Sequence, residues 1–286
     1  VYQTPIWVNI DDIDNLVAED EENSGCLLTG DVYVNPVNGN DDLNDGQSWE
    51  SPFYTITHAI ALVIGTENAP VNIYLAEGTY SPSANGETFP IIMISNVNLI
   101  GQDEKKTILD AALSNPVLII ENCINNTISM LSIIHGFGGV NLDGGGMSIL
   151  SSHPILSHIT FRDNLAAHGG ALFLNGSSPL ITNVTISNNE ATVNGGGILM
   201  EYFSNPILKN VNIVDNIAGE WGGGMNIFFS EPNFLDVSII NNKSGSGGGG
   251  LEITGSNPEL TNLTVTGNET EGGGGGIGFW DTHTIL

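Results

Sequence analysis

The sequence predicts an all-β fold, a right-handed parallel β-helix with a short N-terminal capping helix. The first observation is a repeat whose copies open at prolines separated by 25, 27, 26 and 26 residues, namely Pro154, Pro179, Pro206, Pro232 and Pro258. The second is an asparagine ten residues after each proline, at Asn164, Asn189, Asn216, Asn242 and Asn268, followed by a glycine run. A fixed period of this length indicates an array of stacked units.

The composition of each repeat favours strands over helices. The repeats are rich in Gly, Asn, Thr, Ile and Val and poor in Ala, Lys, Glu and Arg. Apolar residues stand two, five and seven positions after each proline. After the glycines, a second alternation predicts these inward pairs: Ala171/Phe173, Ile198/Met200, Met225/Ile227, Leu251/Ile253 and Ile277/Phe279. Because one unit cannot bury its apolar face alone, we expect coils that stack about 4.8 Å apart and pair in parallel, with right-handed crossovers.

The asparagine that recurs in each repeat has a structural interpretation. At one turn position in every coil, its side-chain amide can donate to the amide oxygen of the next coil, which forms a ladder. We predict such a ladder for Asn164, Asn189, Asn216, Asn242 and Asn268. A second polar column is expected four residues after the prolines, at His158, Asn183, Asn210, Asp236 and Asn262.

The chain divides into a short N-terminal part and one long repeat domain. Residues 1–30 are predicted to form a strand followed by an acidic linker, and residues 31–286 the β-helix, with regular repeats of about 26 residues over 154–286. Within this domain, residues 52–64 are predicted to form the cap helix. Ser51 would cap it, Pro52 would open its first turn, and apolar residues recur at helical spacing along one face. A solenoid end needs such a cover for its apolar side chains and free strand edges.

Two short motifs resemble known bacterial proteins. The run Phe161-Arg162-Asp163-Asn164, followed by Gly169-Gly170-Ala171-Leu172, is similar to the FxxN and GGA(I/L) repeats of chlamydial polymorphic outer-membrane proteins. More broadly, residues 31–286 resemble the pectate-lyase-like right-handed β-helix superfamily of secreted bacterial proteins. The resemblance implies the fold and an exported, often surface-linked protein. It does not imply one activity, because the superfamily includes lyases, hydrolases, adhesins and structural modules.

The charge of the chain excludes several classes of partner. Its 32 acidic and 5 basic residues give a formal net charge of −27. Such a charge repels nucleic acid and anionic lipid surfaces, and it disfavours an anionic polysaccharide unless a cation intervenes. There is no stretch of about 18 apolar residues that would predict direct membrane insertion. We therefore expect no nucleic-acid partner. That the protein is secreted and lies at the cell surface is what the resemblance to exported β-helix proteins implies.

Two further features bear on cofactors and covalent links. Cys26 and Cys123 are the only cysteines. They allow either one disulfide or a buried free thiol at Cys123. Asp41, Asp42 and Asp45 are weak candidates for calcium, since their spacing does not match an EF-hand. No other cofactor is expected.

Residues with catalytic potential do not form a recognisable set. Arg162, Lys209 and Lys243 stand eight, three and eleven residues after their prolines, so they do not share a column as a lyase base and its partners would. Asp163 and Asp215 share an offset two coils apart, about 10 Å, at the outer limit for a glycosidase pair. Asn188 and Asn241 share the same offset, which favours a polar turn column instead. The histidines His153, His158 and His168 lack an acidic or cysteine partner at ligand spacing.

The aromatic residues suggest a surface site. Tyr202, Phe228 and Trp280 lie at or just after the second strand of three repeats, where some aromatic rings must point outward. Such a stripe is suited to stacking on sugar rings or to contact with another protein chain.

We therefore predict a non-catalytic, secreted or cell-surface β-helix with a structural or adhesive role. Its partners would be surface glycans, other proteins or copies of itself, and Thr284, which opens a unit that then stops, suggests end-to-end assembly into a filament. The alternative is a carbohydrate-active enzyme, either a polysaccharide lyase or a glycoside hydrolase, or a glycan-binding module. A cleft with two carboxylates and aromatic platforms would favour the alternative. A flat polar surface would favour the non-catalytic structural or adhesive role.

Overall fold

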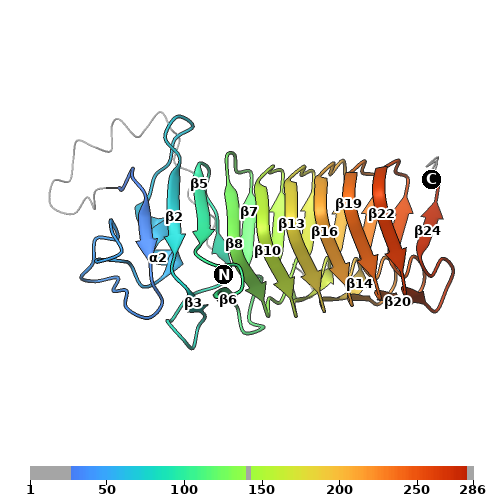
Figure 1. Ribbon diagram of the computed structural model, residues 1–286, viewed down its shortest axis with the longest axis horizontal. Helices are drawn as coiled ribbons and strands as arrows, with labels where there is room; N and C mark the ends of the chain where they lie inside the picture. The colour runs from blue at the N-terminus through green and yellow to red at the C-terminus, as the bar shows by residue number, and fades with distance from the viewer. Residues whose placement is uncertain (1–26, 140–142, 282–286) are drawn as a thin grey trace, which may run out of the picture.

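The computed structural model describes residues 27–139 and 143–281. The chain winds into a long cylinder of stacked coils, which runs from helix α2 (Ile56–Leu62) at one end to strand β24 (Ile277–Trp280) at the other (Figure 1). Every pairing between named strands is parallel, as in the regular coils, where β10 (Ile155–Arg162) pairs with β13 (Leu180–Ser187). The predicted right-handed parallel β-helix is confirmed.

Three parallel sheets form the sides of the cylinder, and each regular coil contributes one strand to each sheet. Besides β10 and β13, the 11-stranded sheet contains β1 (Val32–Val34), β2 (Val71–Leu75), β3 (Gly78–Tyr80), β5 (Val97–Gly101), β6 (Thr107–Asp110), β8 (Thr127–Ile134), β16 (Ile207–Val214), β19 (Asn233–Ile240) and β22 (Glu259–Thr266). Besides β24, the 8-stranded sheet contains β4 (Ile91–Ile92), β7 (Leu118–Glu121), β9 (Met147–Leu150), β12 (Leu172–Asn175), β15 (Ile198–Glu201), β18 (Met225–Phe228) and β21 (Leu251–Thr254). The 5-stranded sheet contains β11 (Leu165–His168), β14 (Glu190–Asn194), β17 (Ile217–Ala218), β20 (Lys243–Ser244) and β23 (Glu269–Thr270).

The second polar column explains why the first strand of each repeat departs from strict alternation. His158, Asn183, Asn210, Asp236 and Asn262 have positive φ values between 52° and 57°. Asn, Asp and His tolerate this left-handed conformation better than most side chains. One residue in this conformation shifts the alternation, so that the buried positions fall two, five and seven residues after the proline, as at Leu156, Ile159 and Phe161.

The five asparagines of the main column form a ladder along the cylinder. The side-chain Nδ2 of each donates to Oδ1 of the next, at 2.9, 2.9, 2.9 and 3.0 Å from Asn164 to Asn268. Each acceptor oxygen also receives the backbone N–H of the preceding asparagine. A hydrogen bond of this kind contributes about 1 kcal/mol net, and an unpaired buried member costs about 1–3 kcal/mol.

The glycine runs allow neighbouring coils to approach at a tight turn. Gly222 has a φ of +67°, and a Cβ on Gly223 would collide with the backbone oxygen of Gly249 in the next coil. A side chain at either position would therefore strain the stack.

The cap helix begins later than the sequence predicts. Thr55 is its N-cap and accepts from the backbone N–H of His58 at 3.2 Å, so the predicted cap at Ser51 and first turn at Pro52 are wrong. The chain before the helix is instead held extended, because Phe53 bridges in parallel to Val34. Tertiary pairing therefore overrides a plausible local start signal. The helix packs against β1 and β2, with Ile56 and Ala59 in the core.

The strand register contradicts one predicted inward pair. Leu172 aligns with Ile198 and Leu174 with Met200, so these residues point inward and Phe173 points outward. The first regular repeat has one residue fewer between Asn164 and the start of β12 than the later repeats have between their asparagine and the corresponding strand. Ala171 consequently takes the place of the third glycine, and its N–H donates to Gly197 O at 3.0 Å.

Several predictions fall on residues outside the described ranges. These are the strand and acidic linker within residues 1–26, the partner cysteine Cys26, and Thr284 with the filament end that it suggested. Cys123 is buried, its Sγ contacts Met93 O at 3.3 Å, and burial raises the pKa of the thiol. Over the described part of the chain, no helix has the length and apolar character needed to span a bilayer.

Candidate functional site

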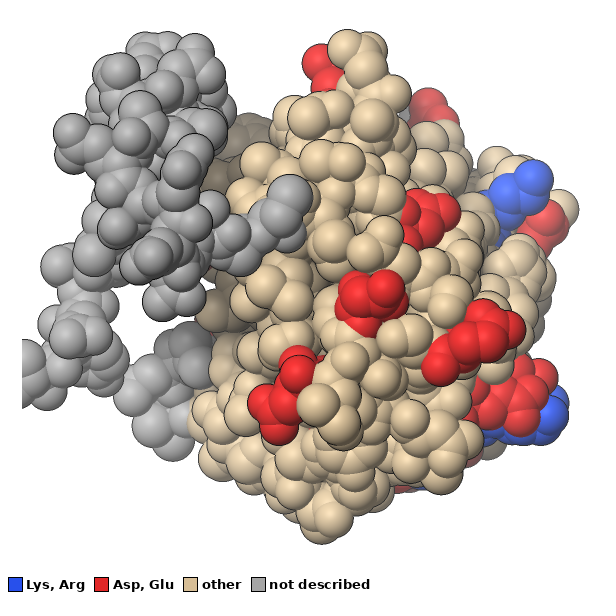
Figure 2. Space-filling model, turned by 90° about the vertical axis from the view of Figure 1, so that its left-hand side faces the viewer, with Lys and Arg blue, Asp and Glu red and all other residues tan. Residues whose placement is uncertain are grey.

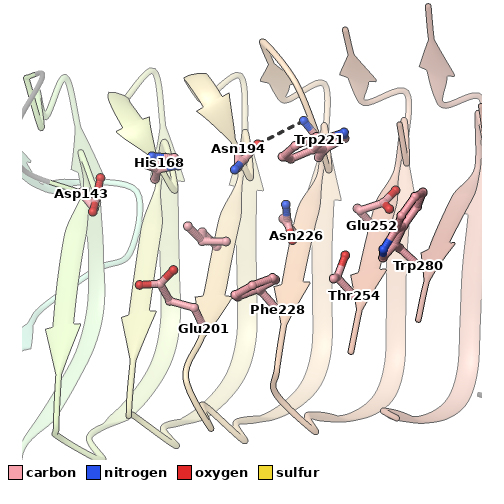
Figure 3. A pocket seen from close by; sticks show the side chains of 11 residues that line it. Asp143, His168, Asn194, Glu201, Trp221, Asn226, Phe228, Glu252, Thr254 and Trp280 are labelled. Atoms are coloured by element: carbon pink, nitrogen blue, oxygen red, sulfur yellow. Dashed lines mark hydrogen bonds between the residues drawn. The ribbon is translucent and has the colours of Figure 1, made fainter. Parts of the chain in front are cut away.

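The outer face of the 8-stranded sheet carries an open groove with a volume of about 680 Å³. Figure 3 shows this groove crossing several coils of the cylinder. Its lining residues are Asp143, His168, Asn194, Leu199, Glu201, Trp221, Asn226, Phe228, Glu252, Thr254 and Trp280. We refer to these eleven residues as the groove.

The floor of the groove is built by two outward columns of the sheet. Register aligns Leu199 with Asn226 and Glu252 in one column. The other column aligns four residues, Glu201, Phe228, Thr254 and Trp280. The residues between these columns point inward and fill the core, as Met200 and Ile227 do. The same alternation that buries the core thus presents these side chains to the groove.

One wall of the groove is formed by residues that precede the strands of the sheet. Asp143, His168, Asn194 and Trp221 come from four successive coils. The backbone N–H of Trp221 donates to Asn194 Oδ1 at 3.3 Å, which links two of these coils (Figure 3). On the opposite side, Tyr202 meets the ring of Phe228 edge to face, with 6.2 Å between ring centroids.

The groove runs parallel to the cylinder axis. Asp143 precedes β9 and Trp280 ends β24, five coils further along. With about 4.8 Å between neighbouring strands, the groove is about 24 Å long. This length is suited to an extended chain molecule rather than to a single small ring.

Two polar atoms in the groove are buried and lack a hydrogen-bond partner among the described residues. They are Asn226 Oδ1 and His168 Nδ1, and the only other such atom in residues 27–139 and 143–281 is Asn126 Oδ1. The Asn226 side chain is 5% exposed. Leaving such an atom unpaired costs about 1–3 kcal/mol, so the clustering of two of them in one groove makes the groove the candidate binding site.

The three carboxylates of the groove have perturbed acidities. Burial raises the pKa of Asp143, although the nearby His168 counteracts the rise. Burial also raises the pKa of Glu201; the hydrogen bond from Asn175 Nδ2, at 2.9 Å, lowers it, and the charge of Asp143 raises it. For Glu252, burial alone raises the pKa. Perturbed carboxyl groups gathered in a cleft are typical of functional sites.

Comparison with known proteins places this architecture in a family. Residues 37–279 match the family described as "Protein of unknown function (DUF1565)". The chain belongs to this family. No curated protein matches the sequence significantly.

Among solved structures, this family member is similar to the crystal structure of pectate lyase Pel9A. The two are 13% identical with a TM-score of 0.56, and the match covers 92% of this chain and 78% of that chain. The crystal structure of Escherichia coli ybhc is 11% identical with a TM-score of 0.44, covering 92% of this chain and 76% of the other. At these identities the likeness to Pel9A shows a shared β-helix fold and nothing about activity.

In this family member the groove contains no Lys or Arg among its lining residues. Arg162, Lys209 and Lys243 lie in β10, β16 and β20, which belong to the other two sheets. Acidic side chains also outnumber basic ones at the N-terminal end of the cylinder, where the basic side chains lie near the edge of the view (Figure 2). The groove is therefore an acidic and aromatic channel.

The structure brings together the aromatic residues that the sequence singled out. Phe228 and Trp280 line the groove, and Tyr202 stands beside it, while Trp221 forms part of one wall. Asp143, Glu201 and Glu252 were not predicted from the sequence. The available signal was their outward position in a strand, or their position just before one, which the inward alternation does not mark.

The other acidic and histidine candidates lie elsewhere. Asp163 and Asp215 belong to a turn column with φ values of 58° and 57°, and Asp163 pairs with Arg162 at 2.6 Å. His153 Nδ1 accepts the backbone N–H of Ser178 at 2.9 Å, outside the groove. Of the three histidines considered, the groove includes His168.

The carboxylates of two of the three calcium candidates, Asp41 and Asp45, accept hydrogen bonds from the protein, and the backbone N–H of the third, Asp42, donates to Asn40 Oδ1 at 2.9 Å. Both carboxylate oxygens of Asp41 accept hydrogen bonds, from Tyr54 and Thr55, and Asp45 accepts from the backbone N–H of Gln47 at 3.0 Å. Within the described ranges, no three His, Cys, Asp or Glu side chains are grouped so that they could hold a metal ion.

Proposed function

We propose that this protein binds a linear glycan in the groove, as a secreted, surface-linked adhesive module. The observation that carries the proposal is the combination, in one open channel, of aromatic rings with buried acceptor atoms that lack protein partners. Sugar rings have apolar C–H faces and a rim of hydroxyl donors, so they match both features. The extracellular location rests on the resemblance of the chain to exported β-helix proteins.

The spacing of the aromatic rings supports a chain-like ligand. Trp221 and Trp280 belong to coils that are two steps apart, with Phe228 in the same coil as Trp221. The two tryptophans are therefore offset by about 10 Å along the axis. Figure 3 shows both indole rings projecting from the coils along the groove. Successive sugar residues of one chain would meet successive rings.

The carboxylates favour glycoside hydrolysis as a second candidate function. Glu201 and Asp143 influence each other electrostatically in the same groove, and both have raised pKa values. An inverting glycosidase needs one protonated carboxyl as acid and one carboxylate as base, on either side of the bond that breaks. Glu201 would donate a proton to the leaving oxygen, and Asp143 would take a proton from the attacking water.

The binding proposal is tested by titrating soluble oligosaccharides of different classes into the protein and following the heat of binding. The affinity for the glycan should fall about tenfold in Trp221→Ala and about tenfold in Trp280→Ala, because each change removes one stacking surface. The matched control is Trp49→Ala, whose ring packs on Tyr33 and not in the groove. Failure of every oligosaccharide to bind, or equal affinity in all variants, overturns the proposal.

Hydrolysis is tested in the same samples by chromatography of the oligosaccharides after long incubation. The wild-type protein should release shorter products, and Glu201→Gln should abolish their release while keeping most of the affinity for a neutral oligosaccharide. Intact oligosaccharides that are bound by the wild-type protein would leave binding as the sole function of the groove.

A further inference from the structure

The acidic side chains of the groove recur at a regular interval along the cylinder. Asp143 belongs to the coil of β9, Glu201 to that of β15 and Glu252 to that of β21, so one carboxylate stands on every second coil. Two coils correspond to about 10 Å. Figure 3 shows the three carboxylates in this order along the groove.

The intervening coils carry the unpartnered buried acceptors. His168 belongs to the coil between Asp143 and Glu201, and Asn226 to the coil between Glu201 and Glu252. Asn226 Oδ1 and the Nδ1 atom of His168 lack protein hydrogen-bond partners within the described residues. Five successive coils thus each present a group that can accept a hydrogen bond from a ligand.

Among the residues that line the groove, His168 is the one that can carry positive charge, and it lies near Asp143. None of its eleven lining residues is Lys or Arg, and all three carboxylates are partly buried. Glu201 and Glu252 have no cationic partner among the lining residues. Partly buried negative charge without a positive partner is unfavourable, and a cationic ligand would relieve it. A polymer of uronic acids would instead add like charge to the groove.

We propose that the glycan bound in the groove carries free amino groups, as in an extended β-1,4-linked aminosugar chain. In such a chain successive residues face opposite sides, so amino groups on one side recur once per disaccharide. Ammonium groups on that side would meet the carboxylates of alternate coils, while hydroxyl groups would donate to Asn226 and His168. This inference rests on the proposed glycan-binding function and specifies its ligand.

The test compares three oligosaccharides of equal length by calorimetric titration: β-1,4-linked glucosamine, its N-acetylated counterpart and an oligogalacturonate. The glucosamine oligomer should bind at least about tenfold more tightly than the N-acetylated one, because hydrogen bonds to charged groups are worth about 1.5–3 kcal/mol. The oligogalacturonate should not bind. Equal or tighter binding of the N-acetylated oligomer overturns this inference but leaves glycan binding standing, whereas failure of every oligosaccharide to bind overturns both.

Variants separate a specific site from general attraction to an acidic protein. Glu201→Gln and Glu252→Gln should each weaken binding of the glucosamine oligomer by about tenfold, and should weaken any binding of the N-acetylated oligomer by a smaller factor. Glu231→Gln is the matched control, because Glu231 is exposed, lies outside the groove and gives the same change in net charge. An equal loss in Glu231→Gln would show general charge attraction and overturn the inference. Thermal unfolding of each variant checks that it is folded.

Discussion

Asn216 and Asn226 lie in the same coil and are both buried, yet the fold treats them differently. Asn216 Oδ1 accepts two hydrogen bonds from Asn189, and its amide donates to Ile186 O and Asn242 Oδ1. Asn226 Oδ1 has no partner within the described residues. The side-chain polar atoms of Asn216 in the ladder are hydrogen-bonded within the protein, whereas the groove contains polar atoms without a protein partner. The contrast separates the residues that build the cylinder from those available to a ligand.

The largest effect is expected from breaking the ladder at its centre. Asn216→Ala removes the partner of two donors on Asn189 and of the carbonyl of Ile186, all in a buried turn. With about 1–3 kcal/mol for each unpaired group, unfolding should become easier by about 3 kcal/mol or more. Urea denaturation followed by far-ultraviolet circular dichroism measures the change.

Asn226→Ala is the matched variant from the groove. It deletes the unpaired oxygen without leaving a buried partner on that oxygen unsatisfied, so stability should stay within about 1 kcal/mol of wild type. A cost as large as that of Asn216→Ala would mean that Asn226 is structural and would remove the distinction between the two regions.

An intermediate effect is expected at Glu87, a buried carboxylate that the fold does satisfy. Glu87 is 1% exposed and accepts the backbone N–H groups of Ile56 and Thr57, at 2.6 and 3.1 Å, at the start of helix α2. Glu87→Ala leaves these donors unpaired and should cost about 2 kcal/mol. Hydrogen exchange over residues 56–62 should accelerate most.

The control for Glu87 is a carboxylate in an exposed ion pair. Glu77 contacts Lys106 at 3.0 Å with both side chains largely in solvent. Such pairs contribute about 0–1 kcal/mol, so Glu77→Ala should change stability by less than that. If Glu77→Ala lowered stability as much as Glu87→Ala does, the hydrogen bonds from helix α2 to Glu87 would contribute no more than an exposed ion pair.

The smallest effect is the pH dependence contributed by the groove. Burial raises the pKa of Glu201 above its ordinary value of 4.5, so between that value and the raised one the folded protein binds more protons than the unfolded chain. Stability from this group is therefore greatest at the acidic side of that interval and declines as the pH rises through it. Melting temperatures measured across this interval should decline less steeply in Glu201→Gln than in wild type. An unchanged slope would mean that the Glu201 carboxyl is not perturbed by burial.

The parts of the fold that repeat were predictable from the sequence. Asn164 to Asn268 recur in one column because each coil must satisfy the same turn in the same way, and the ladder follows from that requirement. Two local details were not predictable. The start of helix α2 depends on the pairing of Phe53 with Val34, and the outward position of Phe173 depends on a shortened glycine turn.

The candidate site was only partly predictable. Phe228 and Trp280 could be predicted because an outward aromatic ring is unusual. Acidic residues on the surface of an acidic protein are common, so Asp143, Glu201 and Glu252 could not be singled out. Asp143, Glu201 and Glu252 are separated by 58 and 51 residues in the sequence, and they occupy different positions in their repeats. Their common position emerges only when the strands are placed in register.

The sequence by itself determined the winding of the chain, because inward and turn positions must recur whenever identical coils stack. Only the tertiary structure decided which outward side chains share the groove. Outward positions are under no such constraint to repeat, and their neighbours come from other coils. The register of the sheets therefore had to be known before Asp143, Glu201, Asn226 and Glu252 could be recognised as one site.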